Sequence, residues 1–377
     1  MRLLISAGEA SGESYGGQLI AALKKREPAL DCFGLGGERM RASGCRIVVD
    51  AKDIAVVGLA EVVTHLPNIW GQFRKLVKAV DQNQPDAAVL IDFPDWNLRL
   101  ARELHRRGVP VIYYVSPQLW AWRPKRIEQI KRYVRRMLVI FPFEEQWYRE
   151  RGVEAEYVGH PLADLPTPGP PPPLRSPQIP IAVLPGSRKK EIALNLPAML
   201  HAARALGNQY QFIIPVASTI SAKWMVDSIH RAVGQDPGIN LKLESDARMV
   251  LRQARAAVVA SGTATVEAAL IGTPFVMVYR VSPLTWKLGR PLVSVPFFAM
   301  PNLIAGREVV PELVQDSFTA ENIVTRMNEI LPEGTARQRM LEALKEVRDK
   351  LAAPAGTAGA ADRAAEAVLA ATGKFQN

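Results

Sequence analysis

Two aspartates and an asparagine are concentrated in one short segment of the first half of the chain. Residues 91–97 read Ile-Asp-Phe-Pro-Asp-Trp-Asn and follow an apolar run that predicts a buried strand. A carboxylate held at a strand end by a proline-fixed turn can accept a proton from a substrate hydroxyl, as a general base does. Asp92 and Asp95 could also simply cap the following helix, so the local sequence leaves both interpretations open.

A second turn carries groups that bind phosphate. Gly186, Ser187 and Arg188 follow a predicted strand and open a helix. Free backbone N–H groups, a hydroxyl and a guanidinium at that point can hold a diphosphate. The turn lacks the Walker spacing G-x-x-x-x-G-K-[ST], so we expect an anion site of a different kind.

A third turn, Ser261-Gly262-Thr263, also lies between a predicted strand and a helix. Its hydroxyls and N–H groups indicate a second anion site. Glu267, about one helical turn further on, could accept hydrogen bonds from ribose hydroxyls or only stabilise the helix N-terminus.

The turn after the first predicted strand is rich in small and acidic residues. Residues 7–13 read Ala-Gly-Glu-Ala-Ser-Gly-Glu, which does not match the dinucleotide fingerprint G-x-G-x-x-G. Glu9 and Glu13 would repel a phosphate and suit sugar hydroxyls or an amide better. Glu9, Ser11 and Gly12 are the candidates of this turn for binding substrate or UDP. A tight turn without a ligand is the alternative.

Two segments are candidates for contact with a membrane or with acyl chains. Trp120, Trp122 and Arg123 precede a predicted helix whose outer faces are basic, as expected of a helix that rests on anionic headgroups. An ordinary solvated helix is the alternative. The second segment, residues 56–77, is unusually apolar and could be core or partly exposed; its membrane candidates are Leu66, Ile69, Trp70 and Phe73.

Alternating strands and helices must position these residues. Apolar runs typical of buried parallel strands lie at residues 2–7, 87–91, 109–115, 137–141, 179–184, 211–215, 239–243, 256–260 and 274–279. Helical patterns between them predict right-handed crossovers and an α/β fold with doubly wound sheets. Ligands of such sheets bind beyond the carboxyl ends of the strands, where the turns above lie.

A proline-rich stretch interrupts this alternation. We predict a first Rossmann-like domain at residues 1–165, a linker at 166–180, a second Rossmann-like domain at 181–345 and a helical tail at 346–377. The tail must dock on the first domain or on a partner subunit, where it could form a homodimer. Carboxylates in the first domain and phosphate sites in the second suggest two substrates that meet in a cleft between the domains.

The composition is that of a globular protein with polyanionic partners. The 377 residues include 47 Lys and Arg against 37 Asp and Glu, a net charge of +10, which favours nucleic acid, anionic lipid or phosphorylated substrates. Two cysteines and five scattered histidines predict a reducing compartment and neither a metal site nor another cofactor. Without a recognisable signal peptide or an apolar run of ~20 residues, we expect a cytoplasmic protein that touches a membrane without crossing it.

An ordered set of motifs resembles lipid-A-disaccharide synthase across nearly the whole chain. The motifs are A-G-E-A-S-G at 7–12, I-D-F-P-D-W-N at 91–97, Y-Y-V-S-P-Q-x-W-A-W-R at 113–123, V-G-H-P-L at 158–162, L-P-G-S-R-x-x-E at 184–191, S-G-T-A-T at 261–265 and P-N-L at 301–303. The resemblance implies an inverting glycosyltransferase of the GT-B type. Such an enzyme transfers 2,3-diacylglucosamine from UDP to the 6-hydroxyl of lipid X (2,3-diacylglucosamine 1-phosphate), forming the β-1,6 disaccharide of lipid A.

The resemblance also implies roles for single residues. Asp95 matches the family's essential aspartate, Arg188 matches the arginine of the nucleotide loop, and Glu267 and Asn302 match positions that line the UDP pocket. Glu13 departs from the family, which usually has aspartate there. The implied location is the cytoplasmic face of the inner membrane, bound peripherally at its anionic surface.

Three other functions are alternatives to this one. A nucleotide-dependent oxidoreductase would need the glycine fingerprint that residues 7–13 lack. A UDP-sugar 2-epimerase has the same architecture but needs no acceptor and no membrane surface. A nucleic-acid-binding module would interleave aromatic and basic residues on an open face, whereas the tryptophans of this chain adjoin one helix. We therefore expect no nucleic acid partner.

Overall fold

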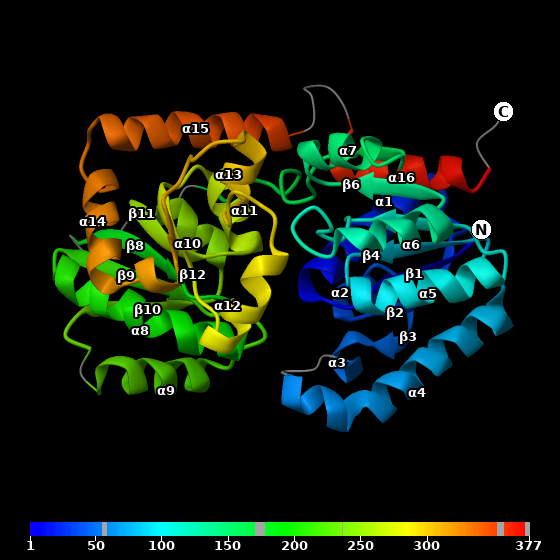
Figure 1. The fold of residues 1–377 in the computed structure, drawn as a ribbon, viewed down its shortest axis with the longest axis horizontal. Coiled ribbons are helices and arrows are strands. Elements are labelled where there is room, and N and C mark those ends of the chain that lie inside the picture. Colours follow the sequence, from blue (N-terminus) through cyan, green and yellow to red (C-terminus); the bar gives the residue numbers. More distant parts are fainter. Residues whose placement is uncertain (55–58, 170–177, 236, 353–357, 374–377) are drawn as a thin grey trace. The chain divides into compact units, whose positions relative to one another are not determined.

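The computed structural model describes residues 1–54, 59–169, 178–235, 237–352 and 358–373, without the side chains of Ala10 and of residues 59–66. The chain forms two compact units: residues 1–164 with 351–377, and residues 165–350. Most of the linker predicted at 166–180 lies outside the described residues. Each unit is a parallel sheet with interleaved helices (Figure 1), which confirms the predicted fold class.

The first unit is built on a seven-stranded parallel sheet. Its strands are β1 (Arg2–Ala7), β2 (Asp31–Gly36), β3 (Arg46–Asp50), β4 (Ala87–Ile91), β5 (Val111–Tyr114), β6 (Arg136–Val139) and β7 (Ala155–Tyr157). They are ordered β3-β2-β1-β4-β5-β6-β7. Every residue of β4 is buried, because helices cover both faces of the sheet and exclude water from its central strands.

Helices connect these strands, and one helix from the end of the chain joins them. They are α1 (Ala10–Arg26), α2 (Glu38–Ala42), α3 (Ala51–Ile54), α4 (Leu59–Asn83), α5 (Pro94–Arg106), the 3-10 helix η1 (Pro124–Arg126), α6 (Ile127–Tyr133), α7 (Pro142–Arg149) and α16 (Ala360–Ala371). The helix α16 lies beside α1 (Figure 1). Arg26 of α1 forms ion pairs with Asp362 at 2.5 Å and with Glu366 at 2.7 Å.

The second unit repeats the architecture with six parallel strands. These are β8 (Ile179–Leu184), β9 (Tyr210–Pro215), β10 (Asn240–Glu244), β11 (Ala256–Ala260), β12 (Phe275–Tyr279) and β13 (Glu312–Val314). Their order is β10-β9-β8-β11-β12-β13, so β8 and β11 are the central pair. Both central strands are apolar runs with almost no exposed residue.

The helices of the second unit cover this sheet. They are α8 (Lys189–Leu206), α9 (Ala222–Val233), α10 (Ala247–Gln253), α11 (Thr263–Ile271), α12 (Pro283–Gly289), η2 (Arg290–Leu292), α13 (Met300–Ala305), η3 (Gln315–Ser317), α14 (Ala320–Ile330) and α15 (Thr335–Leu351). The helices α8 and α11 begin directly after the central strands, which places their N-termini at the carboxyl edge of the sheet.

Candidate active site

Both sheets reverse their strand order beside their first strand, between β1 and β4 in one unit and between β8 and β11 in the other. Ligands of doubly wound sheets bind beyond the carboxyl ends of the strands at such a switch point. The turns singled out in the sequence follow these four strands. The fold therefore brings the predicted site residues of each unit together as a pair of neighbouring turns.

The turn after β4 has a strained backbone. Asp92 and Phe93 have φ angles of 46° and 49°, a left-handed conformation that is uncommon for residues other than glycine. The buried Asn97 donates a hydrogen bond to the Asp92 carbonyl at 2.8 Å, and the Tyr113 hydroxyl donates another at 2.6 Å. These contacts hold a turn that delivers Asp95 into the first turn of α5. Strain maintained in this way is typical of functional sites.

The side chain of Asp95, the predicted base, is 63% exposed. Its Oδ1 atom accepts hydrogen bonds from both Arg126 and Arg123, the latter at 3.4 Å. The loop that carries these arginines is strained as well, because Val115 and Arg123 have φ angles of 63° and 54°. The sequence predicts Arg123 as a membrane contact, whereas the structure pairs it with Asp95.

The turn after β1 packs against the turn after β4. A Cβ atom on Gly8 would lie 2.3 Å from the Phe93 ring, so only glycine permits this approach. Glu9 is the N-cap residue of α1, and Ser11 is half-buried in its first turn. Both residues therefore lie at the carboxyl edge of the sheet that also carries Asp95, whereas Gly12 is buried and serves packing.

Glu13 has a structural partner in the first unit. Its Oε1 atom accepts a hydrogen bond from the backbone N–H of Arg39 at 2.7 Å. That N–H belongs to the first turn of α2, so the Glu13 carboxylate stabilises the start of this helix.

A buried hydrogen bond anchors the loop after β5. The indole of Trp120 donates to Glu144 Oε1 at 2.9 Å, and Glu144 Oε2 accepts from the Phe141 N–H at 3.0 Å. Trp120 is only 8% exposed, so the prediction that it contacts acyl chains or lipid is wrong: its indole N–H requires the buried carboxylate as a partner. Trp122 is exposed, with the Arg123 guanidinium 4.2 Å from its ring centre.

We expect Glu144→Gln to destabilise the protein in a pH-dependent way. Burial raises the pKa of Glu144 from 4.5 to about 7. Between these pH values the folded state binds more protons, so the contribution of Glu144 to the free energy of unfolding falls as the pH rises. The stability advantage of the wild type over the variant should be larger at about pH 5 than at about pH 8, by on the order of 2–3 kcal/mol.

Urea unfolding at the two pH values measures this difference. The buried His160, whose pKa burial lowers to about 3, titrates in both proteins and cancels in the comparison. An advantage that is equal at both pH values would show that Glu144 does not titrate in this range.

The apolar helix α4 has side chains both in the core and on the surface. Phe73 is 7% exposed and packs edge-on against Trp96, so the prediction that it contacts lipid is wrong, because it fills the core under the sheet. Trp70, in contrast, is 51% exposed, and Ile69 is half-buried at the margin of the core. The side chain of Leu66 lies outside the described residues.

In the second unit, the predicted phosphate turn forms the start of α8. Gly186 has a φ angle of 127°, which favours glycine. The N–H groups of Ser187 and Arg188 both point at Glu191 Oε2, at 3.2 and 3.3 Å, and the Arg188 guanidinium donates to Glu191 Oε1 at 3.1 Å. A carboxylate of the protein therefore occupies the position predicted for a phosphate. This exposed ion pair is worth only about 0.2–1 kcal/mol, so a diphosphate could displace it.

The neighbouring turn after β11 opens α11. Gly262 and Thr263 are exposed at the helix N-terminus, whereas the Ser261 hydroxyl donates to the Phe298 carbonyl at 2.9 Å. Glu267 lies one turn into the helix, and burial raises its pKa above the ordinary value. Exposed N–H groups at this point suit an anion.

Asn302 does not line an open site. It is fully buried, and its Oδ1 accepts from the N–H groups of Val309 and Val310 at 2.7 and 2.9 Å. Its Nδ2 donates to the Val310 carbonyl at 2.9 Å and to Glu312 at 2.8 Å. All four hydrogen-bonding positions of the amide are used, so the implied contact with UDP is wrong for this side chain. Asn302 instead fixes the segment whose Phe298 carbonyl accepts the hydrogen bond of the Ser261 hydroxyl.

The stripe of exposed leucines on α12 and η2 was not predicted from the sequence. Leu284, Leu288 and Leu292 are 68%, 66% and 60% exposed. Their spacing of four residues was the available signal, but the segment is short and contains Gly289 and two prolines. Lys287 and Arg290 lie between the leucines.

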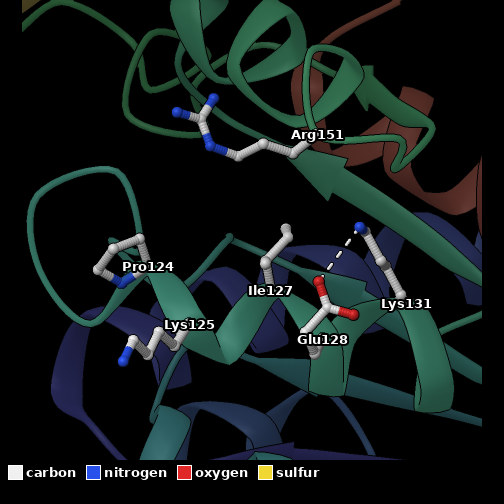
Figure 2. A pocket seen from close by; sticks show the side chains of 6 residues that line it. All are labelled: Pro124, Lys125, Ile127, Glu128, Lys131 and Arg151. Carbon is white, nitrogen blue, oxygen red and sulfur yellow. Dashed lines mark hydrogen bonds and ion pairs between the residues drawn. The ribbon is translucent and has the colours of Figure 1, made fainter.

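An open hollow on the first unit is lined by basic side chains. Figure 2 shows Lys125, Lys131 and Arg151 around Ile127, with the ammonium of Lys131 paired with Glu128 at 3.2 Å. Within residues 1–54, 59–169, 178–235, 237–352 and 358–373, no group of three or more His, Cys, Asp or Glu side chains could hold a metal ion. No helix of the described chain combines the length and the apolarity that crossing a bilayer requires.

Comparisons with known proteins agree with these features. The family model described as lipid-A-disaccharide synthetase matches residues 3–360. The lipid-A-disaccharide synthases of Koribacter versatilis and Myxococcus xanthus are 54% and 44% identical, covering 98% of this chain in both cases and 98% and 97% of the relatives.

Similarity to solved structures extends to more distant proteins. The calicheamicin glycosyltransferase CalG4 is 17% identical with a TM-score of 0.63, covering 100% of this chain and 99% of its own. The UDP-GlcNAc 2-epimerase of Neisseria meningitidis is 10% identical with a TM-score of 0.65, covering 98% and 99%. These two likenesses show the fold alone.

Proposed function

The chain belongs to the lipid-A-disaccharide synthase family, and from this premise we propose how its residues divide the reaction. It is a glycosyltransferase of lipid A biosynthesis that joins 2,3-diacylglucosamine from its UDP derivative to lipid X, releasing UDP. The proposal assigns the acceptor hydroxyl to the carboxyl edge of the first sheet and the nucleotide diphosphate to that of the second.

Asp95 acts as the general base in this proposal. The acceptor 6-hydroxyl gives its proton to the Asp95 carboxylate, and the electron pair of the broken O–H bond forms the new bond to the anomeric carbon of the donor. The bond from that carbon to the diphosphate breaks, and its electrons leave with UDP. Direct displacement of this kind inverts the anomeric centre and gives the β-1,6 linkage. Glu9 and Ser11 are assigned to the sugar hydroxyls of the acceptor.

The leaving diphosphate is stabilised by the second unit. The N–H groups of Ser187 and Arg188, the Arg188 guanidinium and the start of α11 at Gly262–Thr263 provide fixed positive charge where negative charge develops. We propose that this charge is sufficient without a metal or another cofactor. Glu267 is assigned to the ribose hydroxyls.

We further propose that the enzyme binds peripherally to the cytoplasmic face of the inner membrane. The exposed Trp70 and Trp122 and the leucine stripe of α12 and η2 supply apolar contacts. Among the described residues, Lys125, Arg132 and Arg135 have no carboxylate partner and are available to anionic headgroups. High salt should release the protein only partly from phosphatidylglycerol vesicles; complete release would remove the apolar part of this proposal.

A homodimer through the tail is not supported by the contacts of α16. Its buried face, including Ala364, Ala365 and Val368, packs within its own unit, where Arg26 also pairs with two of its carboxylates. We propose that the tail completes the first unit of its own chain. Light scattering of the purified full-length protein tests this: a mass of one chain would exclude a dimer through the tail.

The observation that carries the proposal is the pair of turns at the switch point of each sheet. The turns of the first unit present the exposed Asp95 carboxylate, and those of the second unit present exposed N–H groups and Arg188. Purified protein is incubated with UDP-diacylglucosamine and lipid X, with and without EDTA. We expect UDP and a disaccharide 1-phosphate in equal amounts in both samples. Release of a free sugar without lipid X would instead indicate the epimerase reaction.

A further inference from the structure

Asp95, the assigned base, is paired with two arginines through one oxygen of its carboxylate. Oδ1 accepts hydrogen bonds from Arg123 and Arg126 at the same time, so both guanidinium groups lie beside the place assigned to the acceptor hydroxyl. Oδ2, the other oxygen of the same carboxylate, remains to take the proton of that hydroxyl. The two arginines therefore offer positive charge next to the assigned base.

The acceptor carries a group that matches this positive charge. Lipid X has a phosphate on C1 and its reacting hydroxyl on C6, and C1 and C5 flank the same ring oxygen. A sugar with its 6-hydroxyl at Asp95 therefore holds its phosphate within a side-chain length of that carboxylate. A phosphate monoester carries a charge of about −1.5 to −2 at neutral pH and pairs with guanidinium groups in bidentate geometry.

The loop that carries the arginines is built to hold them near Asp95. Arg123 is the left-handed residue that precedes η1, and Arg126 ends η1. The indole of Trp120, three residues before Arg123, is tied to the buried Glu144. The backbone is thus fixed while the Arg123 side chain, 46% exposed, remains accessible.

We propose that Arg123 and Arg126 form the binding site for the acceptor phosphate and so hold the acceptor with its 6-hydroxyl at Asp95. The proposal rests on the function assigned to Asp95 above. In the hollow of Figure 2, Lys131 is paired with Glu128, and Arg151 lies 4.1 Å from the Trp147 ring centre. The assignment goes to Arg123 and Arg126 because both contact Asp95. An acceptor with a phosphate would then be preferred over one without it.

The test compares lipid X with the same diacylglucosamine lacking the 1-phosphate, in detergent, for the wild type, Arg123→Gln, Arg126→Gln and the double variant. Arg99→Gln is the matched control, because Arg99 is exposed one helical turn beyond Asp95 and makes no ion pair among the described residues. We expect each variant to lose at least about tenfold in kcat/KM for lipid X. With the acceptor that lacks the phosphate, each variant should keep kcat/KM close to that of the wild type, because that acceptor has no group for either arginine to bind.

The outcomes separate this inference from the proposed function. Equal losses on both acceptors, or a preference for lipid X that survives in the double variant, would overturn the inference. Asp95→Asn is measured in parallel, and full activity in that variant would contradict the function assigned to Asp95 itself. Thermal unfolding of each variant shows whether a loss reflects the fold, and Arg126→Lys retains the charge if Arg126→Gln unfolds.

Discussion

Replacing Asp95 by asparagine is expected to lower kcat for disaccharide formation by about 10²–10⁴-fold, the range in which a general base contributes. Asparagine has nearly the same shape but cannot take the proton of the acceptor hydroxyl. The side chain is 63% exposed and takes no part in the core, so the fold should be unaffected. Turnover with both lipid substrates at saturation measures the loss, and titration of UDP shows that nucleotide binding is retained.

Asp92→Asn is the matched control for this prediction. Asp92 lies three residues earlier in the same segment, and its left-handed φ of 46° is tolerated by asparagine. This variant should keep most of its activity, because Asp92 positions the turn through its backbone carbonyl. A strong loss in Asp92→Asn together with near-normal turnover in Asp95→Asn would reverse the two assignments.

Replacing Arg188 by alanine is expected to reduce turnover by about 10²–10³-fold, which corresponds to the ~2.7–4 kcal/mol contributed by one preorganised donor to a developing charge. The Arg188 side chain is 65% exposed and pairs only weakly with Glu191, so its removal should leave stability nearly unchanged. The loss should appear in both kcat and the affinity for UDP, because the guanidinium contacts the diphosphate before and after the bond breaks.

Two variants control for unspecific loss of charge. Arg188→Lys keeps the charge without the forked donor and should recover part of the activity. Lys190→Ala removes an exposed charge two residues away and should have little effect. If Arg188→Ala and Lys190→Ala lowered UDP affinity to the same small extent, general attraction would explain the result and Arg188 would lose its specific role.

The central strands could be predicted from sequence because they are buried on both faces. The limits predicted for β1, β4, β8 and β11 agree with the structure, and all four consist mainly of buried apolar residues. The strand β2 was missed because it contains two glycines. Gly34 is one of them, and a Cβ atom there would lie 1.9 Å from the Ile5 carbonyl oxygen. The close approach of β1 therefore requires glycine, and the glycines interrupt the apolar run that would mark a buried strand. The strands β7 and β13 have only three residues each.

The site could be predicted in its turns but not in its contacts. Strand ends and motif residues place Asp95 and Arg188, because topology decides which turns are neighbours. Which side chains are buried depends on tertiary packing. Trp120 and Phe73 resemble surface aromatics in sequence, yet the indole of Trp120 bonds the buried Glu144 and the ring of Phe73 packs on Trp96 of α5. The pairing of Arg123 and Arg126 with Asp95 joins segments about 30 residues apart and has no local signal.

The most direct test of the account is a crystal structure of the Asp95→Asn variant with UDP-diacylglucosamine and lipid X bound. The account predicts that the diphosphate contacts the N–H groups of Ser187 and Arg188, with Glu191 displaced from them. It also predicts that the acceptor 6-hydroxyl lies within hydrogen-bond distance of the side chain at position 95. A nucleotide bound at the carboxyl end of β1, or an acceptor hydroxyl remote from position 95, would contradict it.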